Sequence, residues 1–323
     1  MNNKIIILNM MRNKNKQSFF ALHQIYTKIK NINNNIDIEF HILWDNIIEG
    51  KDESTTKWSD IIDNFGFNIT SYNKQFFNEY CQQAYNISNS YIDKFSSFKA
   101  IYFILMAHYI RRTKLYNTYL IYDDDIIIQY DFKDVVDALL ADRAVFISEP
   151  MNFNCDKVLI PKLYEIYGNE LIQSYSNKNP QGLGFNAGFQ GIDLSLYDDF
   201  LSSDRFLMLL NLFNYSGIYD KNGKEIWGVK RFEIDTQQQS FFSIMNVVKC
   251  RNNPLILNQN EYFVIPNWGV HPIYGQINTE DENDGWTYAM KSKIVHFIGH
   301  TQGKGKPKFF LDYVDKYISN INI

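Results

Sequence analysis

The sequence predicts an α/β protein: a three-layer sandwich whose central sheet is mainly parallel. Two observations lead to this prediction. Across the first half of the 323-residue chain, short apolar runs alternate with longer segments whose apolar residues recur at helical spacing. Strands separated by helices form parallel sheets with helices on both faces. A chain of this length also buries enough apolar surface to form the core that such a sheet needs.

The individual elements follow from this alternation. Apolar runs predict strands over residues 4–9, 36–44, 119–122 and 144–148. Helical spacing, as in Phe20, Ile25 and Ile29, predicts helices over residues 17–32, 58–65, 74–85, 96–111, 132–141 and 309–318. Ligands of such sheets bind at the carboxyl ends of the strands, so we expect the functional site there.

The second half of the chain is more irregular. It holds most of the glycines, a glycine-rich segment over residues 179–194 and a charged loop over residues 278–285. No linker rich in Pro, Gly or Ser separates the two halves, although the character of the sequence changes near residue 150. We therefore expect a single domain over residues 1–323.

Charge and cysteine content exclude several classes of protein. The chain has 32 Lys and Arg against 36 Asp and Glu, so it lacks the basic excess of a nucleic-acid-binding protein, and we expect no nucleic-acid partner. Cys81, Cys155 and Cys250 form neither a disulfide framework nor a zinc motif, which indicates the reducing cytoplasm. We expect no signal peptide and no transmembrane segment, because no apolar run reaches the required length.

The first chemical signal is Asp123-Asp124-Asp125, which stands between two apolar runs. Strand alternation places Asp123 and Asp125 on one side and Asp124 on the other. Two converging carboxylates repel each other unless a cation lies between them. A divalent ion with oxygen ligands meets this need and also binds phosphate oxygens. The alternative interpretation is a helix cap or a solvated turn.

Two segments of the second half combine amides, acids and small residues. In residues 182–194, glycine and alanine flank Asn186, so the backbone can approach a ligand and the amide can bond sugar hydroxyls. A glycine-rich turn that leads into a strand is the alternative there. Residues 233–240 place Asp235 and Gln237 where a helix is expected to begin. Capping of that helix by Asp235 explains the acid equally well.

The last signal is His296, on an apolar strand that leads into a loop with Gly299, Lys304 and Lys306. Neutral imidazole is a good ligand for Mn²⁺. Lysine together with glycine backbone amides suits a diphosphate. The alternative interpretation is a buried core histidine whose hydrogen bonds are satisfied.

Together and in this order, the motifs resemble retaining glycosyltransferases of the GT-A fold. The closest resemblance is to glycosyltransferase family 8, which includes glycogenin and bacterial lipopolysaccharide galactosyltransferases. It spans residues 4–307 and rests on Asp123-Asp124-Asp125, Phe185-Asn186-Ala187-Gly188, Asp235-Thr236-Gln237, and His296-Phe297-Ile298-Gly299 with Lys306-Pro307. The chain departs from the family after the first strand, where Asn9-Met10-Met11-Arg12 lacks the usual acid.

The resemblance implies a metal-dependent transferase that moves a hexose from UDP-glucose or UDP-galactose to a glycan, protein or lipid acceptor, with retention of configuration. Mn²⁺, or Mg²⁺, would be held by Asp123, Asp125 and His296. Residues 1–150 would form the nucleotide-binding half, and residues 151–323 the sugar and acceptor half with its C-terminal metal-binding segment.

The resemblance also assigns the remaining site residues. Among the catalytic residues, Asn186 and Asp235 would hold the transferred sugar, and Asp235 and Gln237 are the candidates for a nucleophile. The residues that would contact the nucleotide sugar are Asn9, Arg12, Lys99, Asp124, Glu149, Ala187, Gly188, Gly299, Lys304 and Lys306. Among them, Lys99 would stand in for the arginine that the family carries in the helix before the acids.

Three alternatives stay open at the level of sequence. One is an inverting GT-A transferase, in which Asp235 or Glu233 would act as the base. Another is a catalytically degenerate protein that binds a nucleotide or a glycan without turnover. The third is a nucleotidyltransferase, which also uses paired acids but does not account for the segment around His296.

Overall fold

The computed structural model describes twelve parts of the chain: residues 3–11, 13–44, 53–86, 99–113, 118–149, 164, 168–178, 184–193, 254–257, 262–266, 292–298 and 308–321. Six of the residues expected in the site lie outside these ranges, namely Arg12, Asp235, Gln237, Gly299, Lys304 and Lys306. The helix expected to begin near residue 235 lies outside them as well.

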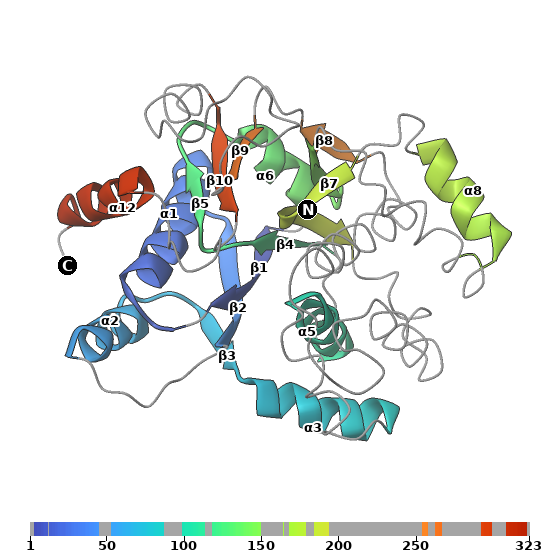
Figure 1. Ribbon diagram of the computed structural model, residues 1–323, viewed down its shortest axis with the longest axis horizontal. Coiled ribbons are helices and arrows are strands. Elements are labelled where there is room, and N and C mark those ends of the chain that lie inside the picture. The colour runs from blue at the N-terminus through green and yellow to red at the C-terminus, as the bar shows by residue number, and fades with distance from the viewer. Residues whose placement is uncertain are drawn as a thin grey trace.

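The described elements form two sheets and a set of surrounding helices (Figure 1). The central sheet contains β1 (Lys4–Met11), β2 (Asp37–Trp44), β3 (Ile69–Tyr72), β4 (Thr118–Tyr122), β6 (Val145–Glu149), β7 (Gly184–Asp193) and β8 (Leu255–Leu257). The smaller sheet contains β5 (Ile126–Ile128), β9 (Tyr262–Pro266) and β10 (Ile294–Ile298). The helices are α1 (Lys16–Ile32), α2 (Glu53–Asn64), α3 (Lys74–Tyr85), α5 (Lys99–Thr113), α6 (Lys133–Leu140), α8 (Asn169–Lys178) and α12 (Lys308–Ser319).

The central sheet confirms the predicted α/β architecture. Its strand order is β3-β2-β1-β4-β7-β6-β8, and neighbours are parallel except where β7 runs antiparallel to both β4 and β6. The helices α1 and α2 connect parallel neighbours, as crossover connections require. Because β7 and β8 come from the second half of the chain, both halves contribute to one sheet.

Helices pack on both faces of this sheet. Ile7 of β1 lies in a buried cluster with Leu22 of α1 and Val135 of α6. Side chains alternate along a strand, so the buried Ile6 faces the opposite side, where α5 packs against β1. Burial on both faces explains why β1 is a nearly continuous apolar run.

The smaller sheet joins the central one through the acidic motif. Its middle strand, β10, runs parallel to β9 and antiparallel to β5. Only Asp123, Asp124 and Asp125 separate β4 of the central sheet from β5 of the smaller sheet. The three acids are therefore the link by which the chain passes from one sheet to the other.

The structure extends or corrects several sequence predictions. The glycine-rich segment over residues 179–194 was expected to be irregular. Residues 184–193 instead form the ten-residue strand β7, which pairs with β4 in the central sheet. The short strands β3 and β5 and the helix α8 were not predicted. Within the described residues, no helix is long and apolar enough to cross a lipid bilayer.

Candidate metal centre

The acidic link is fixed at both ends by backbone hydrogen bonds. The N–H of Asp123 donates to the carbonyl of Gly188 on β7 at 2.8 Å. The carbonyl of Asp125 accepts from the N–H of Phe297 on β10 at 3.0 Å. The first acid is therefore registered against the central sheet, and the third acid against the smaller sheet.

The helix α1 supports the same link through two glutamines. Gln24 is buried; its Nε2 donates to the Tyr122 hydroxyl at 2.7 Å and to the Ile126 carbonyl at 2.9 Å, and its Oε1 accepts from the Ile128 N–H at 2.8 Å. Nearer the start of the helix, Nε2 of Gln17 donates to the carbonyl of Asp124 at 3.2 Å. Side-chain amides of α1 thus hold the turn that carries the acids through hydrogen bonds.

Asp123, Asp125 and His296 converge at this point. One ligand atom from each lies within 4.8 Å of the others. Nε2 of His296 is 3.0 Å from Oδ1 of Asp125 and 3.6 Å from Oδ2 of Asp123. The side chains of Asp123, Asp125 and His296 are 16%, 11% and 7% exposed. Low exposure strengthens the electrostatic interactions within the group.

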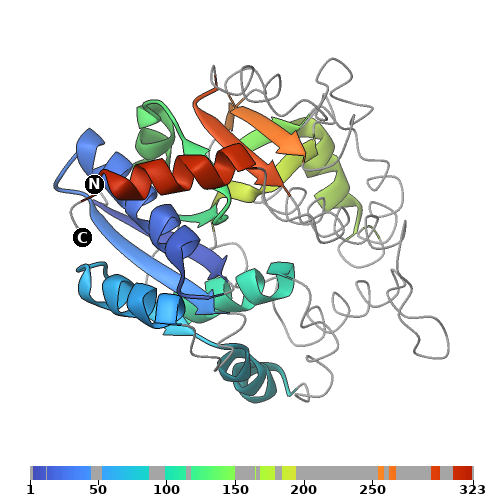
Figure 2. The same ribbon diagram turned by 60° about the vertical axis from the view of Figure 1, so that its left-hand side comes forward.

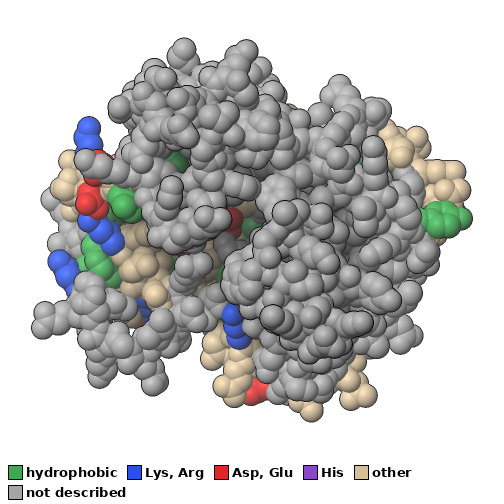
Figure 3. Space-filling model, in the orientation of Figure 1, with side chains coloured by type: hydrophobic (Ala, Val, Ile, Leu, Met, Phe, Trp, Pro, Cys, Tyr) green, Lys and Arg blue, Asp and Glu red, His purple; other side chains and the backbone are tan. Residues whose placement is uncertain are grey.

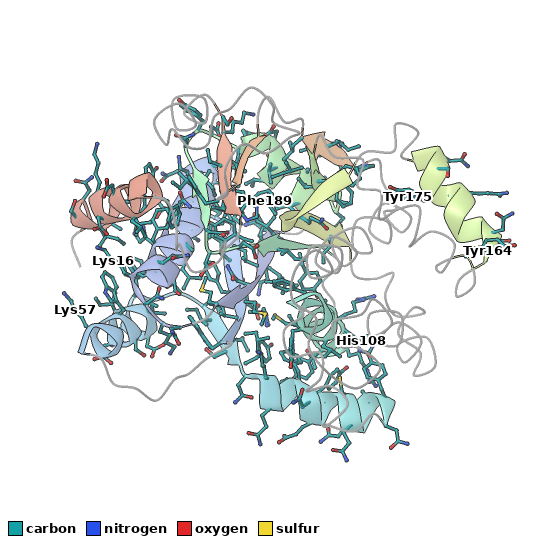
Figure 4. The ribbon with its side chains drawn as sticks, viewed as in Figure 1. Lys16, Lys57, His108, Tyr164, Tyr175 and Phe189 are labelled. Atoms are coloured by element: carbon teal, nitrogen blue, oxygen red, sulfur yellow. The ribbon has the colours of Figure 1, made fainter. Side chains whose placement is uncertain are left out.

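Gly188 makes this convergence possible. A β-carbon at this position would lie 2.3 Å from Cε1 of His296 and 2.7 Å from Oδ2 of Asp123. The pairing of β6 with β7 also shifts register here, since Phe146 pairs with Gln190 but Ser148 pairs with Phe185. Such a bulge bends a strand locally and is common beside active sites. Figure 4 labels the next residue, Phe189, near the middle of the molecule.

The three side chains fit a divalent metal ion. Two carboxylate oxygens and one imidazole nitrogen are a donor set that Mn²⁺ accepts, and the carboxylates alone suit Mg²⁺. Because Gly188 has no β-carbon, His296 and Asp123 can lie against the backbone of β7 and so come close to each other. Without a cation, two carboxylates this close would repel each other.

Four other predicted site residues lie at the carboxyl edge of the central sheet. Lys99 begins α5, Glu149 ends β6, and Asn186 and Ala187 lie on β7 just before Gly188. The structure does not describe the side chains of these four residues. Their contacts with a nucleotide sugar, like those of Asp124, stay predictions.

Asn9 lies one position beyond the Leu8–Ile121 pair, so it reaches the edge where β4 ends. Its side chain is fully buried, and neither amide atom has a hydrogen-bond partner in the described part of the chain. An unpaired buried amide is costly. The structure thus places Asn9 beside the candidate site without testing its predicted contact with the base.

The two glutamines that hold the acidic turn, Gln17 and Gln24, were not predicted from the sequence. Gln24 lies between the apolar residues Leu22 and Ile25, on the mainly apolar buried side of α1. An amide at such a position signals a buried hydrogen-bond network. Its partners on β4 and β5, however, are identified only by the tertiary fold.

Comparisons with known proteins were made at the levels of family, sequence and structure. No protein-family model matches the chain, and no curated protein matches it. Among solved structures, the bifunctional glycosyltransferase WbbM in its apo form matches with a TM-score of 0.49 and 13% identity, covering 100% of this chain and 50% of WbbM. The chain thus spans half the length of WbbM.

Two further structures cover nearly the full length of both chains. An active-site mutant of LgtC matches with a TM-score of 0.49 and 12% identity, over 99% of this chain and 97% of LgtC. The apo form of mouse xyloside xylosyltransferase 1 matches with a TM-score of 0.47 and 11% identity, over 94% of this chain and 100% of that one.

Proposed function

We propose that this protein is a metal-dependent glycosyltransferase of the GT-A type, similar to family 8, which transfers a hexose from UDP-glucose or UDP-galactose with retention of configuration. The acceptor is a glycan, a protein or a lipid. The observation that carries the proposal is the convergence of Asp123, Asp125 and His296 within 4.8 Å. Residues far apart in the sequence meet there at the end of β4.

The position and the chemistry of the group both favour a nucleotide diphosphate as ligand. In sheets of this kind, ligands bind beyond the carboxyl ends of the strands, and the acidic link lies at that edge. Asp123 and Asp125 offer hard oxygen donors, and His296 adds a nitrogen donor from β10. A bound Mn²⁺ or Mg²⁺ neutralises the charge that grows on the leaving diphosphate.

Other residues of the chain orient the sugar and bind the diphosphate. Asn186, just before the metal site on β7, orients the transferred sugar through its amide, together with Asp235 and Gln237. The Gly299 loop with Lys304 and Lys306 binds the diphosphate. In this proposal residues 1–150 supply most of the nucleotide site, residues 151–323 supply the sugar and acceptor site, and the enzyme works in the cytoplasm.

The decisive experiment is a panel of sugar nucleotides incubated with the protein and Mn²⁺, scored for release of the nucleoside diphosphate. We expect turnover with UDP-glucose or UDP-galactose and loss of turnover in EDTA. The anomeric configuration of the product, read by NMR, decides between retention and inversion. Tight UDP binding without turnover on any donor would contradict the proposed enzyme and identify a degenerate binding protein.

Asp125→Asn is the matched variant, because it keeps the size of the side chain and removes its charge. The control is Asp137→Asn, at an exposed position on α6. We expect the first variant to lose the metal-dependent activity and the second to keep it. Equal activity of both variants would exclude the acidic link as the metal site.

A further inference from the structure

The strand β10, which carries His296, is covered on its other face by the C-terminal helix. His296 alternates along the strand with Val295 and Phe297, so these two side chains point away from the acids. Both are fully buried and belong to a small core with Phe310 and Val314 of α12. The rings of Phe297 and Phe310 have centroids 4.9 Å apart. The residue next to the metal ligand therefore packs directly on α12.

The helix α12 is itself anchored on α1. Both ribbon views show the two helices side by side (Figures 1 and 2). The ring of Phe20 on α1 meets Phe310, Tyr313 and Tyr317 edge to face, at centroid distances of 6.2, 6.0 and 5.0 Å. Edge-to-face aromatic pairs add stabilisation beyond the area that they bury.

Polar contacts complete this anchor. The Tyr317 hydroxyl is hydrogen-bonded to Nδ1 of His23 at 2.9 Å, and Lys16 forms an ion pair with Asp315. Figure 4 labels Lys16 at this junction, and Figure 3 shows lysine and acidic side chains on the same side of the molecule. The helix that covers β10 is thus tied to the helix whose glutamines hold the acidic turn.

One backbone hydrogen bond connects this packing to two of the three candidate metal ligands, Asp125 and His296. Phe297 donates its N–H to the carbonyl of Asp125, and it follows His296 directly. If the Phe297 side chain loses its support, the strand moves, and the distance between Asp125 and His296 changes with it. A packed core transmits such a shift because it has few voids in which to absorb it.

We propose that α12 is a positioning clamp for the metal site: Phe310 and Val314 press β10 toward the acids, so docking of α12 and occupancy of the metal site stabilise each other. The inference rests on the proposed function, because it requires that Asp123, Asp125 and His296 bind a metal. Linkage is reciprocal, so metal must strengthen the docking of α12 as much as the docked helix strengthens metal binding.

The first measurement is amide hydrogen exchange of the whole wild-type protein with and without Mn²⁺ alone. We expect Mn²⁺ to slow exchange in α12, while α3, on the other side of the molecule from α12, serves as internal reference (Figure 1). A helix with only a structural role would exchange at the same rate in both conditions. This readout needs no variant, so it decides the question even if every α12 variant fails to fold.

The second measurement compares Mn²⁺ affinity by calorimetry in Phe310→Ala, Phe310→Leu and Leu311→Ala. Phe310 is fully buried, whereas Leu311 on the same helix is 47% exposed and serves as the matched control. We expect roughly tenfold weaker binding for Phe310→Ala, within the usual range for coupled sites. Phe310→Leu should recover most of the loss, and Leu311→Ala should bind normally.

The outcomes separate the two proposals. Wild-type protein that binds Mn²⁺ without slower exchange in α12 overturns the clamp and leaves the metal site intact. Unchanged affinity in a folded Phe310→Ala variant does the same. Wild-type protein that binds no Mn²⁺ overturns both the clamp and the metal-dependent function.

Discussion

A β-carbon on Gly188 would lie 2.3 Å from Cε1 of His296, closer than two carbon atoms can approach without a bond. The imidazole of His296 on β10 therefore lies directly against the backbone of Gly188 on β7. Because the N–H of Asp123 bonds the carbonyl of the same glycine, one residue positions two of the three candidate ligands. The glycine of the Phe185-Asn186-Ala187-Gly188 motif thus has a steric role in this structure.

Replacing Gly188 with alanine should displace His296 and weaken Mn²⁺ binding. The added methyl group would occupy the space of the imidazole, and mutation of the groups that orient a metal ligand typically costs roughly 10- to 100-fold in affinity. Calorimetric titration with Mn²⁺ measures this loss. Normal affinity in the variant would show that the imidazole does not need this space.

A double-mutant cycle gives the control. His296→Ala removes the ring that the new methyl group would strike, so Gly188→Ala should destabilise the wild-type protein more than the His296→Ala protein. The free energy of unfolding of the four metal-free proteins tests this. Additive effects would mean that the two positions are not in contact.

The second prediction concerns Asp125. The variant Asp125→Asn should lose most of its Mn²⁺ affinity while the metal-free protein keeps its melting temperature, because the backbone bond from Phe297 to residue 125 is unchanged. Melting curves with and without Mn²⁺ measure both effects. We expect Mn²⁺ to raise the melting temperature of the wild type but not of the variant.

Sequence patterns predicted the elements whose signals are local. The helix α3 was predicted with the bounds that the structure shows, because Asn73 caps its start by accepting from the Phe76 N–H, and Asn86 ends it in the left-handed region. The strands β1 and β2 were predicted because burial on both faces makes most of their residues apolar.

Elements whose stability comes from distant partners were missed. The strand β7 contains glycines that suggest a turn, yet its neighbours β4 and β6 pair with it and make it a strand. The strand β5 has three residues, too few for a periodic signal. Tertiary pairing overrides local preference in both cases.

The residues of the candidate site fall into the same two groups, those that the sequence predicted and those that were missed. Asp123, Asp125 and His296 were predicted as one metal site because the ordered motifs resemble a known family, and the structure brings them together. Their supports, Gln24 and Gln17, belong to no motif. Their roles depend on the packing of α1 against the link between the sheets, and the sequence does not encode that packing as a local pattern.

The third prediction concerns Gln24. Gln24→Leu should destabilise the protein by about 2–4 kcal/mol, because it leaves the Ile128 N–H and the Ile126 carbonyl buried with lost partners. Urea unfolding measures the change. The control is Gln75→Leu, at an exposed position on α3, where a change within about 0.5 kcal/mol is expected. Equal stability of Gln24→Leu and the wild type would contradict the structural role.

A second polar network lies on the far side of β1 and β2 from the helix α1. His41 is buried, with Nε2 2.8 Å from Oε1 of Glu39 and Nδ1 2.6 Å from the Tyr72 hydroxyl. Lys4 pairs with Glu39 at 3.2 Å and so offsets the charge of that carboxylate. Burial, with the Lys4 ammonium nearby, lowers the pKa of His41 from 6.5 to about 4.

The fourth prediction follows from this lowered pKa. Between pH 6.5 and 4, His41 is protonated in the unfolded chain but stays neutral in the folded protein. The free energy of unfolding should therefore fall as the pH falls through this window. One proton corresponds to a slope of at most about 1.4 kcal/mol per pH unit.

The His41→Gln variant keeps a polar side chain but has no titrating group, so its stability should fall less steeply. Urea unfolding of both proteins at several pH values across this window isolates His41, because every other titrating group contributes to both curves. Parallel curves would mean that His41 has the same pKa in the folded and the unfolded chain, and that the network with Glu39 and Tyr72 does not hold it neutral.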